Sequence, residues 1–421
     1  MALSDLSNIT AIRLTRFFMK FTGFWISDNP RDKLLMVILT GYTIVAIAIA
    51  CLICSCDLWF SRTNLDLATY TACNMMTVLT IVIKLATFTF RREKFMSLIK
   101  NCYEKFWIAD YDEDDLSILR NCELRCVYFV ETFTFFALST VCTYTAYPII
   151  ENVGKNETDR IHPFTIWLNF PTSSTPYFEL IFVIEILSCF HSGICYFCFD
   201  NLLCIINVFT AGQFRMLQRK LELVQYTDEY DSQTNSFTEI SVKDKYENFS
   251  KIVSAEKQYR PNKTLKNCIE KHQCLIEFIK LVEEMYTYVI LGQVVIFSLL
   301  ICLVSYQAVL ADGEFSRRMI FIVHFAGTFT QLFMFTLTCD DLIRESQAVA
   351  EAAYAARWYR CLSDPSRRTL GKDLIFVIMR ARRPCCLTAG GFFPISLETF
   401  TTILSTAMSY LTLLRNGQVE D

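Results

Sequence analysis

The chain has 421 residues, of which 53% are apolar and 14% aromatic, and its mean hydropathy is positive. Water-soluble proteins of this length rarely have such a high apolar content, so the composition argues against a soluble domain. The formal net charge of −3 gives no electrostatic footprint for nucleic acid, and no such partner is expected. Charged residues are confined to short blocks between long apolar runs, a pattern that predicts an all-α protein with several membrane spans.

The first 30 residues carry Arg13, Arg16 and Lys20 but no continuous apolar region followed by a cleavage site. A cleaved signal peptide is therefore not expected, and the first span itself directs insertion. Seven apolar runs of about 20 residues follow, each long enough to cross a bilayer as a helix. They are Leu34–Cys56, Leu65–Phe90, Val127–Ile150, Phe178–Thr210, Tyr288–Leu310, Met319–Cys339 and Phe392–Leu414. The fourth run is long enough to tilt or to protrude.

Between the sixth and seventh runs, Asp373–Pro384 has an apolar core that is too short to span and ends in arginines and a proline. We interpret it as a cytosolic half-helix. The expected fold is an all-α, polytopic membrane protein with seven transmembrane helices and a cytosolic helical anchor region. No internal repeat is visible, which weakens a transporter built from inverted repeats.

The orientation follows from the distribution of lysine and arginine, because cytosolic segments carry the excess of these residues. The segments on the same side of the membrane as the N-terminus contain 30 lysines and arginines, and the segments on the opposite side contain six. The long block Arg215–Lys280 counts for less in this rule, but without it the numbers are still 18 and six. The charge bias predicts a cytosolic N-terminus and an extracellular C-terminus. The sequon at Asn156 then lies outside, although sequons alone do not decide the orientation.

The cytosolic segments also carry helical patterns. Leu265–Val282 places seven residues on one helical face, so the fifth span is expected to begin well inside the cytosol. These seven are Cys268, Ile269, His272, Leu275, Ile276, Ile279 and Val282. Arg344–Leu362 is interpreted as another helix, which Asp364-Pro365 ends. The predicted organisation is a six-helix bundle (1–342) with a long cytosolic loop (211–287), cytosolic helices (343–384) and a final transmembrane helix (385–421).

Catalysis and metal binding find no support in the sequence. The chain contains no Walker A, GxSxG, HExxH or GxGxxG motif, so no catalytic site and no cofactor are expected. Most of the 19 cysteines lie inside apolar runs, where small buried hydrophobes are their expected role. The acidic run Asp110–Asp115 lacks the spacing and turn glycine of a calcium loop, and we interpret it as a solvated loop and helix start.

Six ionisable residues lie within the apolar runs, where a charge is costly and marks either a water-filled site or an internal pair. They are Lys84, Glu131, Glu185, His191, Asp200 and His324. For Lys84 and Asp200, snorkelling or internal pairing is the favoured interpretation. Glu185 and His324 lie nearer the outer half of their spans, and a cavity and internal pairing are equally weighted for them.

The last apolar run carries a polar stripe on one helical face and an apolar face opposite. The stripe consists of Thr399, Thr402, Thr406, Ser409, Tyr410, Leu413 and Asn416. Such a stripe faces either another helix, where hydroxyls bond across, or water. The physical argument alone favours helix packing, and the water-lined alternative stays open.

Five segments near the C-terminus form a recognisable pattern: Ala353–Tyr359, Leu374–Arg380, Leu387–Gly390, Ser396–Phe400 and, most specifically, Ser409-Tyr410-Leu411-Thr412-Leu413-Leu414-Arg415. Together they resemble the signature of insect odorant receptors. The match covers roughly the last seventy residues, and the rest of the chain agrees in plan. The chain lacks the endings typical of the olfactory co-receptor and of gustatory relatives. It therefore resembles a ligand-specific tuning subunit, in a style similar to the receptors of ants, bees and wasps.

The resemblance implies a non-selective cation channel in the plasma membrane of olfactory sensory neurons. Such a channel is a heterotetramer with olfactory co-receptor subunits, and the last span of each subunit lines the pore. It also implies that a small hydrophobic odorant or pheromone binds in the outer halves of spans two to six. The implied pocket residues are Tyr70, Asn74, Thr140, Tyr144, Phe182, Glu185, Ile186, His324, Phe325 and Thr328. The implied pore and gate residues are Tyr410, Leu413 and Asn416.

Two alternative functions remain open at this stage. A G-protein-coupled receptor also has seven spans and detects small molecules, but its N-terminus lies outside and its positive charge bias is reversed. A membrane transporter is the second alternative, weakened by the missing repeat.

Overall fold

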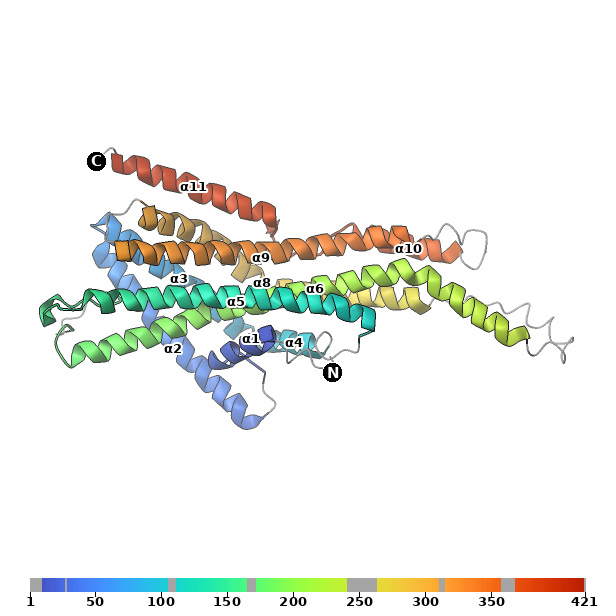
Figure 1. The fold of residues 1–421 in the computed structure, drawn as a ribbon, viewed down its shortest axis with the longest axis horizontal. Coiled ribbons are helices and arrows are strands. Elements are labelled where there is room, and N and C mark those ends of the chain that lie inside the picture. The colour runs from blue at the N-terminus through green and yellow to red at the C-terminus, as the bar shows by residue number, and fades with distance from the viewer. Residues whose placement is uncertain are drawn as a thin grey trace.

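A computed structural model describes residues 10–26, 29–104, 111–164, 172–240, 263–309, 315–356 and 368–419. Its first elements are α1 (Thr10–Phe21), α2 (Pro30–Ser61), α3 (Leu65–Phe90), α4 (Arg92–Cys102), α5 (Glu113–Glu151) and the 3₁₀ helix η3 (Glu157–Asp159). They are followed by α6 (Tyr177–Ile240), α8 (Lys263–Val309), α9 (Phe315–Ala355), α10 (Arg368–Ala381), β1 (Thr388–Ala389), β2 (Phe393–Pro394) and α11 (Leu397–Val419). The long helices form one elongated bundle, and α11 lies along its edge (Figure 1).

Six helices of the described chain are long and apolar enough to cross a membrane: α2, α3, α5, α6, α8 and α9. The seventh predicted span is also a helix, α11, with 23 residues. At 1.5 Å per residue it is about 34 Å long, which matches the bilayer core. It is not among the six helices that are apolar enough by composition alone, which fits the threonines and serines of its stripe. The protein is a helical polytopic membrane protein, as the sequence predicted.

Three of the helices extend far beyond a bilayer core. α6 has 64 residues, α8 has 47 and α9 has 41. The segment 211–287, expected to be a loop, is therefore helical over its described residues, and the expected boundary at 342 lies inside α9. The reason is that no proline interrupts these helices, so each span continues into the cytosol as a helix. Asp364-Pro365, the expected end of the helix after Arg344, lies outside the described residues, where Trp358 and Tyr359 also lie.

The bundle buries one large core and one smaller one. The large core includes the apolar face predicted around Leu265–Val282, with Leu275, Ile279 and Val282 almost fully buried. The smaller core joins α8 and α9 to Ile403 and Ala407 of α11. In contrast, α2 exposes a long series of large apolar side chains, including Leu34, Val37, Ile38, Val45 and Leu52. Such a series on an outer helix fits contact with lipid.

The acidic run is where α5 begins. Asp112 precedes the first turn, and Asp114 and Asp115 lie in it, where negative charge stabilises the helix N-terminus. Lys220 of α6 lies 2.8 Å from Asp115 and 3.6 Å from Asp112, and Arg219 pairs with Asp114. The interpretation as a helix start is confirmed, and the run also joins α5 to α6. Among the described residues, no group of histidine, cysteine or acidic side chains could hold a metal ion.

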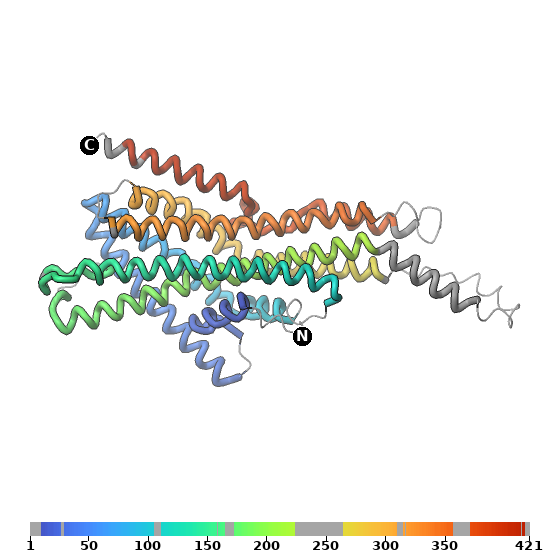
Figure 2. The backbone as a smooth tube through the Cα atoms, viewed as in Figure 1, coloured from blue at the N-terminus to red at the C-terminus, as the bar shows by residue number. Residues whose placement is uncertain are grey.

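A short β-hairpin connects α10 to α11. Gly390 and Gly391 form its turn with φ of +61° and +80°, a backbone conformation that glycine adopts without strain. The N–H of Gly390 donates to the carbonyl of Thr287 at 3.1 Å, and the Thr388 hydroxyl donates to Glu283 at 2.7 Å. Both partners lie on α8, so the hairpin is fixed to that helix. The hairpin thereby sets the position at which α11 begins, and α11 then leaves the bundle at an angle (Figure 2).

The orientation can be tested by tag accessibility. Because the positive charges concentrate on one side, we expect a tag fused ahead of Met1 to be labelled only after permeabilisation. A tag inserted beside the exposed Asn156, which precedes η3, should be labelled on intact cells. Labelling at Met1 on intact cells would reverse the topology and favour the G-protein-coupled alternative.

Candidate functional site

A cavity of about 370 Å³ lies inside the bundle, within the range of about 300–1,000 Å³ that is typical of small-molecule sites. It is enclosed by α2, α3, α5, α6 and α9, together with one loop residue, Phe164. Its walls are mainly apolar, and they include Ile49, Ile53, Val78, Ile81, Phe133, Phe136, Val141, Ile181, Ile184 and Phe197. A mainly apolar cavity of this size suits a small hydrophobic molecule.

The structure places six of the ten predicted pocket residues in the cavity wall: Asn74, Thr140, Tyr144, Glu185, His324 and Thr328. The other four, Tyr70, Phe182, Ile186 and Phe325, do not line it. Phe325 directly follows His324, and Ile186 directly follows Glu185. Adjacent residues of a helix point in directions about 100° apart, so only one of each pair faces the cavity. The predicted set therefore contains residues that line the cavity and residues that face away from it.

The remaining two predicted residues pack elsewhere. The ring of Tyr70 meets Phe321 edge to face, with 5.6 Å between centroids, and Phe182 stacks on Phe178 at 5.5 Å. The cavity also differs from the expected spans two to six. The first span, α2, contributes to its wall, whereas α8, the fifth span, contributes none of its described residues.

The segment between α5 and α6 contributes residues to one end of the cavity, and sequence reasoning did not identify them. His162 approaches Glu185 of α6, with 3.1 Å between Nδ1 and Oε2, and its Nε2 lies 3.3 Å from the carbonyl oxygen of Thr172. Phe164 stacks near Tyr144 of α5, with 6.4 Å between ring centroids. Burial is the largest single influence and lowers the pKa of His162, but the hydrogen bond and the charge of Glu185 and the hydrogen bond to Thr172 together outweigh it, so the pKa is raised from its ordinary value. The docked loop therefore favours the protonated ring.

Three buried polar atoms at this end of the cavity have no hydrogen-bond partner. They are the Tyr144 hydroxyl, Glu185 Oε1 and His324 Nδ1, and each of these side chains is more than 90% buried. The rings of Tyr144 and His324 meet edge to face, with 6.2 Å between centroids. Buried polar groups are normally satisfied, so three unsatisfied atoms in one cavity wall indicate a place for a partner that carries polar groups.

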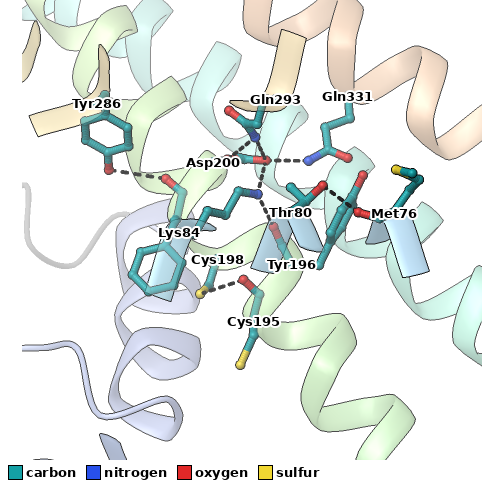
Figure 3. Close-up of polar contacts among 11 residues, drawn as sticks. Met76, Thr80, Lys84, Cys195, Tyr196, Cys198, Asp200, Tyr286, Gln293 and Gln331 are labelled. Atoms are coloured by element: carbon teal, nitrogen blue, oxygen red, sulfur yellow. Dashed lines mark hydrogen bonds and ion pairs between the residues drawn. The ribbon is translucent and has the colours of Figure 1, made fainter. Parts of the chain in front are cut away.

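A buried ion pair joins α3 to α6 (Figure 3). Lys84 Nζ of α3 lies 2.8 Å from Asp200 Oδ2 of α6, and the Lys84 side chain is 0% exposed. Asp200 also accepts hydrogen bonds from Gln293 of α8, at 3.0 Å, and from Gln331 of α9. Lys84 further donates to the carbonyl oxygen of Tyr196 at 2.6 Å. The sequence favoured either snorkelling or internal pairing for Lys84 and Asp200, and the structure shows an internal pair.

This network touches the cavity directly. Tyr196 and Gln331 belong both to the network and to the cavity wall. Four helices, α3, α6, α8 and α9, each contribute a side chain to it. A molecule in the cavity therefore lies against the groups that hold these four helices together.

The polar stripe of α11 faces away from the rest of the chain. Tyr410 is 46% exposed and Leu413 is 66% exposed, and Asn416 is also exposed. On the opposite face, Ile403 and Ala407 are buried against the second core. The alternative in which the stripe packs against helices of the same chain is therefore wrong for these exposed residues.

Comparisons with known proteins agree with this architecture. The sequence model of the family described as 7tm Odorant receptor matches residues 64–408. Odorant receptor 13a of Drosophila melanogaster is 24% identical, and the match covers 96% of this chain and 95% of that one. The odorant receptor coreceptor of Harpegnathos saltator is 26% identical over only 36% of this chain and 30% of its own.

The fold resembles that of the olfactory receptor OR5 from Machilis hrabei, alone and in complex with eugenol. In both structures the TM-score is 0.77 at 14% identity, covering 96% of this chain and 97% of that one. The fold and the family match together cover the long helices, the cavity and most of α11. The chain therefore belongs to the insect odorant receptor family, and it is a transmembrane receptor rather than an enzyme.

Proposed function

We propose that this receptor is the ligand-binding subunit of a ligand-gated, non-selective cation channel, and that a small hydrophobic odorant binds in the cavity. The observation that carries the proposal is the mainly apolar cavity of about 370 Å³ between the helices. The structure of a similar receptor in complex with eugenol supports a small-molecule ligand. The six predicted residues in the wall would orient the ligand, and the apolar walls would supply contact area.

The proposed pore is formed by α11 together with the corresponding helices of partner subunits. Its support is the stripe with Tyr410, Leu413 and Asn416, three side chains that the described helices leave exposed. A heterotetramer with co-receptor subunits in the plasma membrane of olfactory sensory neurons fits the family. In it, the cytosolic parts of α8, α9 and α10 would form the anchor between subunits.

Filling the cavity tests this proposal. Gly327 lines the cavity, and a Cβ at this position would lie 3.4 Å from Phe136 and 3.8 Å from Thr140, which are ordinary contacts. Gly327→Ala should therefore fold and respond, whereas Gly327→Leu should fold but occupy the ligand's volume. We expect Gly327→Leu to reduce odorant-evoked current at least tenfold when expressed with co-receptor and recorded by voltage clamp.

The matched control is Gly41→Leu. Gly41 lies on the exposed side of α2, and a Cβ there would have no neighbour within 4 Å. This substitution should leave the concentration–response curve unchanged at equal surface expression. Equal odorant responses in Gly327→Leu and Gly41→Leu would place the ligand site outside this cavity.

A further inference from the structure

The polar wall at the outer end of the cavity has a defined hydrogen-bonding character. Its central group is Glu185, which is 8% exposed and lies in the cavity wall. Oε2 of Glu185 is engaged with His162, whereas Oε1 has no partner. Leaving such an atom unsatisfied costs free energy, so a ligand that satisfies it gains affinity over one that does not.

The contacts of His162 determine what Oε1 can do. The carbonyl oxygen of Thr172, 3.3 Å from Nε2, can only accept, so Nε2 carries a proton. Nδ1 then either carries a second proton and donates to an ionised Glu185, or accepts the proton of a neutral Glu185. In both arrangements the shared proton lies between Nδ1 and Oε2. Oε1 is therefore a hydrogen-bond acceptor in both protonation states.

Tyr144 of the neighbouring helix α5 complements this acceptor. Its hydroxyl is buried, unpartnered and able to donate. His324, beside it, presents an unpartnered ring nitrogen to the same region. A ligand group that donates to Glu185 and accepts from Tyr144 or His324 would satisfy these atoms together. A hydroxyl does both, whereas an ether oxygen only accepts and a hydrocarbon does neither.

We propose that the cavity selects small, mainly hydrocarbon alcohols and phenols, with Glu185 Oε1 accepting the ligand hydroxyl proton and Tyr144 donating to the ligand oxygen. The inference rests on the proposed function, because it assumes that the cavity is the odorant site. Glu185 and Tyr144 are thus the side chains that would recognise the hydroxyl group of this ligand class. The apolar walls contact the hydrocarbon part of the ligand. The shape of the cavity therefore decides which chain lengths and branching patterns fit.

Isomeric pairs test the selection, since the two members contain the same atoms. The pairs are 2-phenylethanol with benzyl methyl ether, 4-ethylphenol with 4-methylanisole, and 1-octanol with heptyl methyl ether. In voltage-clamp recordings with co-receptor, we expect the hydroxyl member of at least one pair to activate at about tenfold lower concentration than its ether. Ethers as potent as the alcohols, or no response to any alcohol in the panel, would overturn the inference.

Two substitutions of Glu185 assign the preference to this residue. Glu185→Met keeps the side-chain length but removes the acceptor, and it should bring alcohol and ether to similar potency. Glu185→Gln can donate its amide to His162 Nδ1 and turn its carbonyl oxygen into the cavity, so it should retain the preference. The readout is the potency ratio within each pair, which does not depend on surface level. Tyr144→Phe removes a donor from which both ligand oxygens can accept, so it should weaken both members of a pair and leave their ratio near that of the wild type. Glu185→Leu, which also lacks the acceptor, serves if Glu185→Met does not fold.

The results for Gly327→Leu and Glu185→Met together distinguish a failure of the hydroxyl selection from a failure of the proposed function. If Gly327→Leu abolishes all responses while the ratio is the same in Glu185→Met and wild type, the cavity is the site but the hydroxyl selection is wrong. If Gly327→Leu leaves the responses intact, the cavity is not the site and the proposed function itself fails.

Discussion

Removing either partner of the buried Lys84–Asp200 pair should strongly destabilise the receptor. Lys84→Met leaves the Asp200 carboxylate without its cation, and Asp200→Leu leaves the Lys84 ammonium in a site that is 0% exposed. Breaking a buried pair in this way typically costs about 3–5 kcal/mol, because a charge remains buried without compensation. We expect each single variant to show a large loss of the folded peak and a lower melting temperature in fluorescence-detected size-exclusion chromatography.

The double variant Lys84→Met/Asp200→Leu provides the decisive comparison. It contains neither charge, so it should recover much of the stability that each single variant loses. Lys100→Gln is the exposed control: its pair with Glu104 is 3.7 Å long, and both side chains are more than half exposed. That change should cost less than about 1 kcal/mol. Single variants as stable as wild type would mean that the pair does not hold the four helices together.

Replacing Leu413 with serine should raise the ligand-independent current several-fold. Leu413 is the one aliphatic residue between Ser409 and Asn416 on the exposed stripe of α11, and it is 66% exposed in the single chain. A ring of aliphatic side chains can close a pore by excluding water, because a cation there loses hydration without gaining ligands. A serine rehydrates one sector of that ring, so the closed state becomes leakier.

The control for the gate is Leu404→Ser. Leu404 packs against the second core, so this substitution should lower expression without raising basal current at matched surface level. The effect at Leu413 will be partial where co-receptor subunits supply the other gate residues. Unchanged basal current, permeability and open probability in Leu413→Ser would remove α11 from the pore and return its stripe to a contact with lipid or another subunit.

The features that the sequence predicted well are those with a strong local period. The apolar face of Leu265–Val282 and the two faces of α11 follow directly from 3.6-residue periodicity, and both are present in the structure. The cost of charge in an apolar run likewise identified Lys84, Asp200, Glu185 and His324 as residues that need a partner or a cavity. These properties depend on one helix at a time.

The features that sequence reasoning missed depend on more than one helix. Lys84 and Asp200 are 116 positions apart, so their pairing required the packing of α3 on α6. His162 and Phe164 lie in a loop without periodicity, and only the fold brings them over the cavity. Tyr70 and Phe325 are aromatic residues in the correct helices, yet their rotation about the helix axis turns them toward other helices. A resemblance to a family can identify the helical segments near a cavity. Which face of each helix lines the cavity depends on how the helices pack.

The most direct test of the central claim is a structure of the receptor with co-receptor subunits, determined by electron cryomicroscopy with an activating alcohol from the panel. We expect ligand density in the cavity between α2, α3, α5, α6 and α9, with the ligand oxygen beside Glu185 Oε1 and the Tyr144 hydroxyl. We also expect α11 at the central pore. An empty cavity with the ligand bound elsewhere in an activated channel would contradict the central claim.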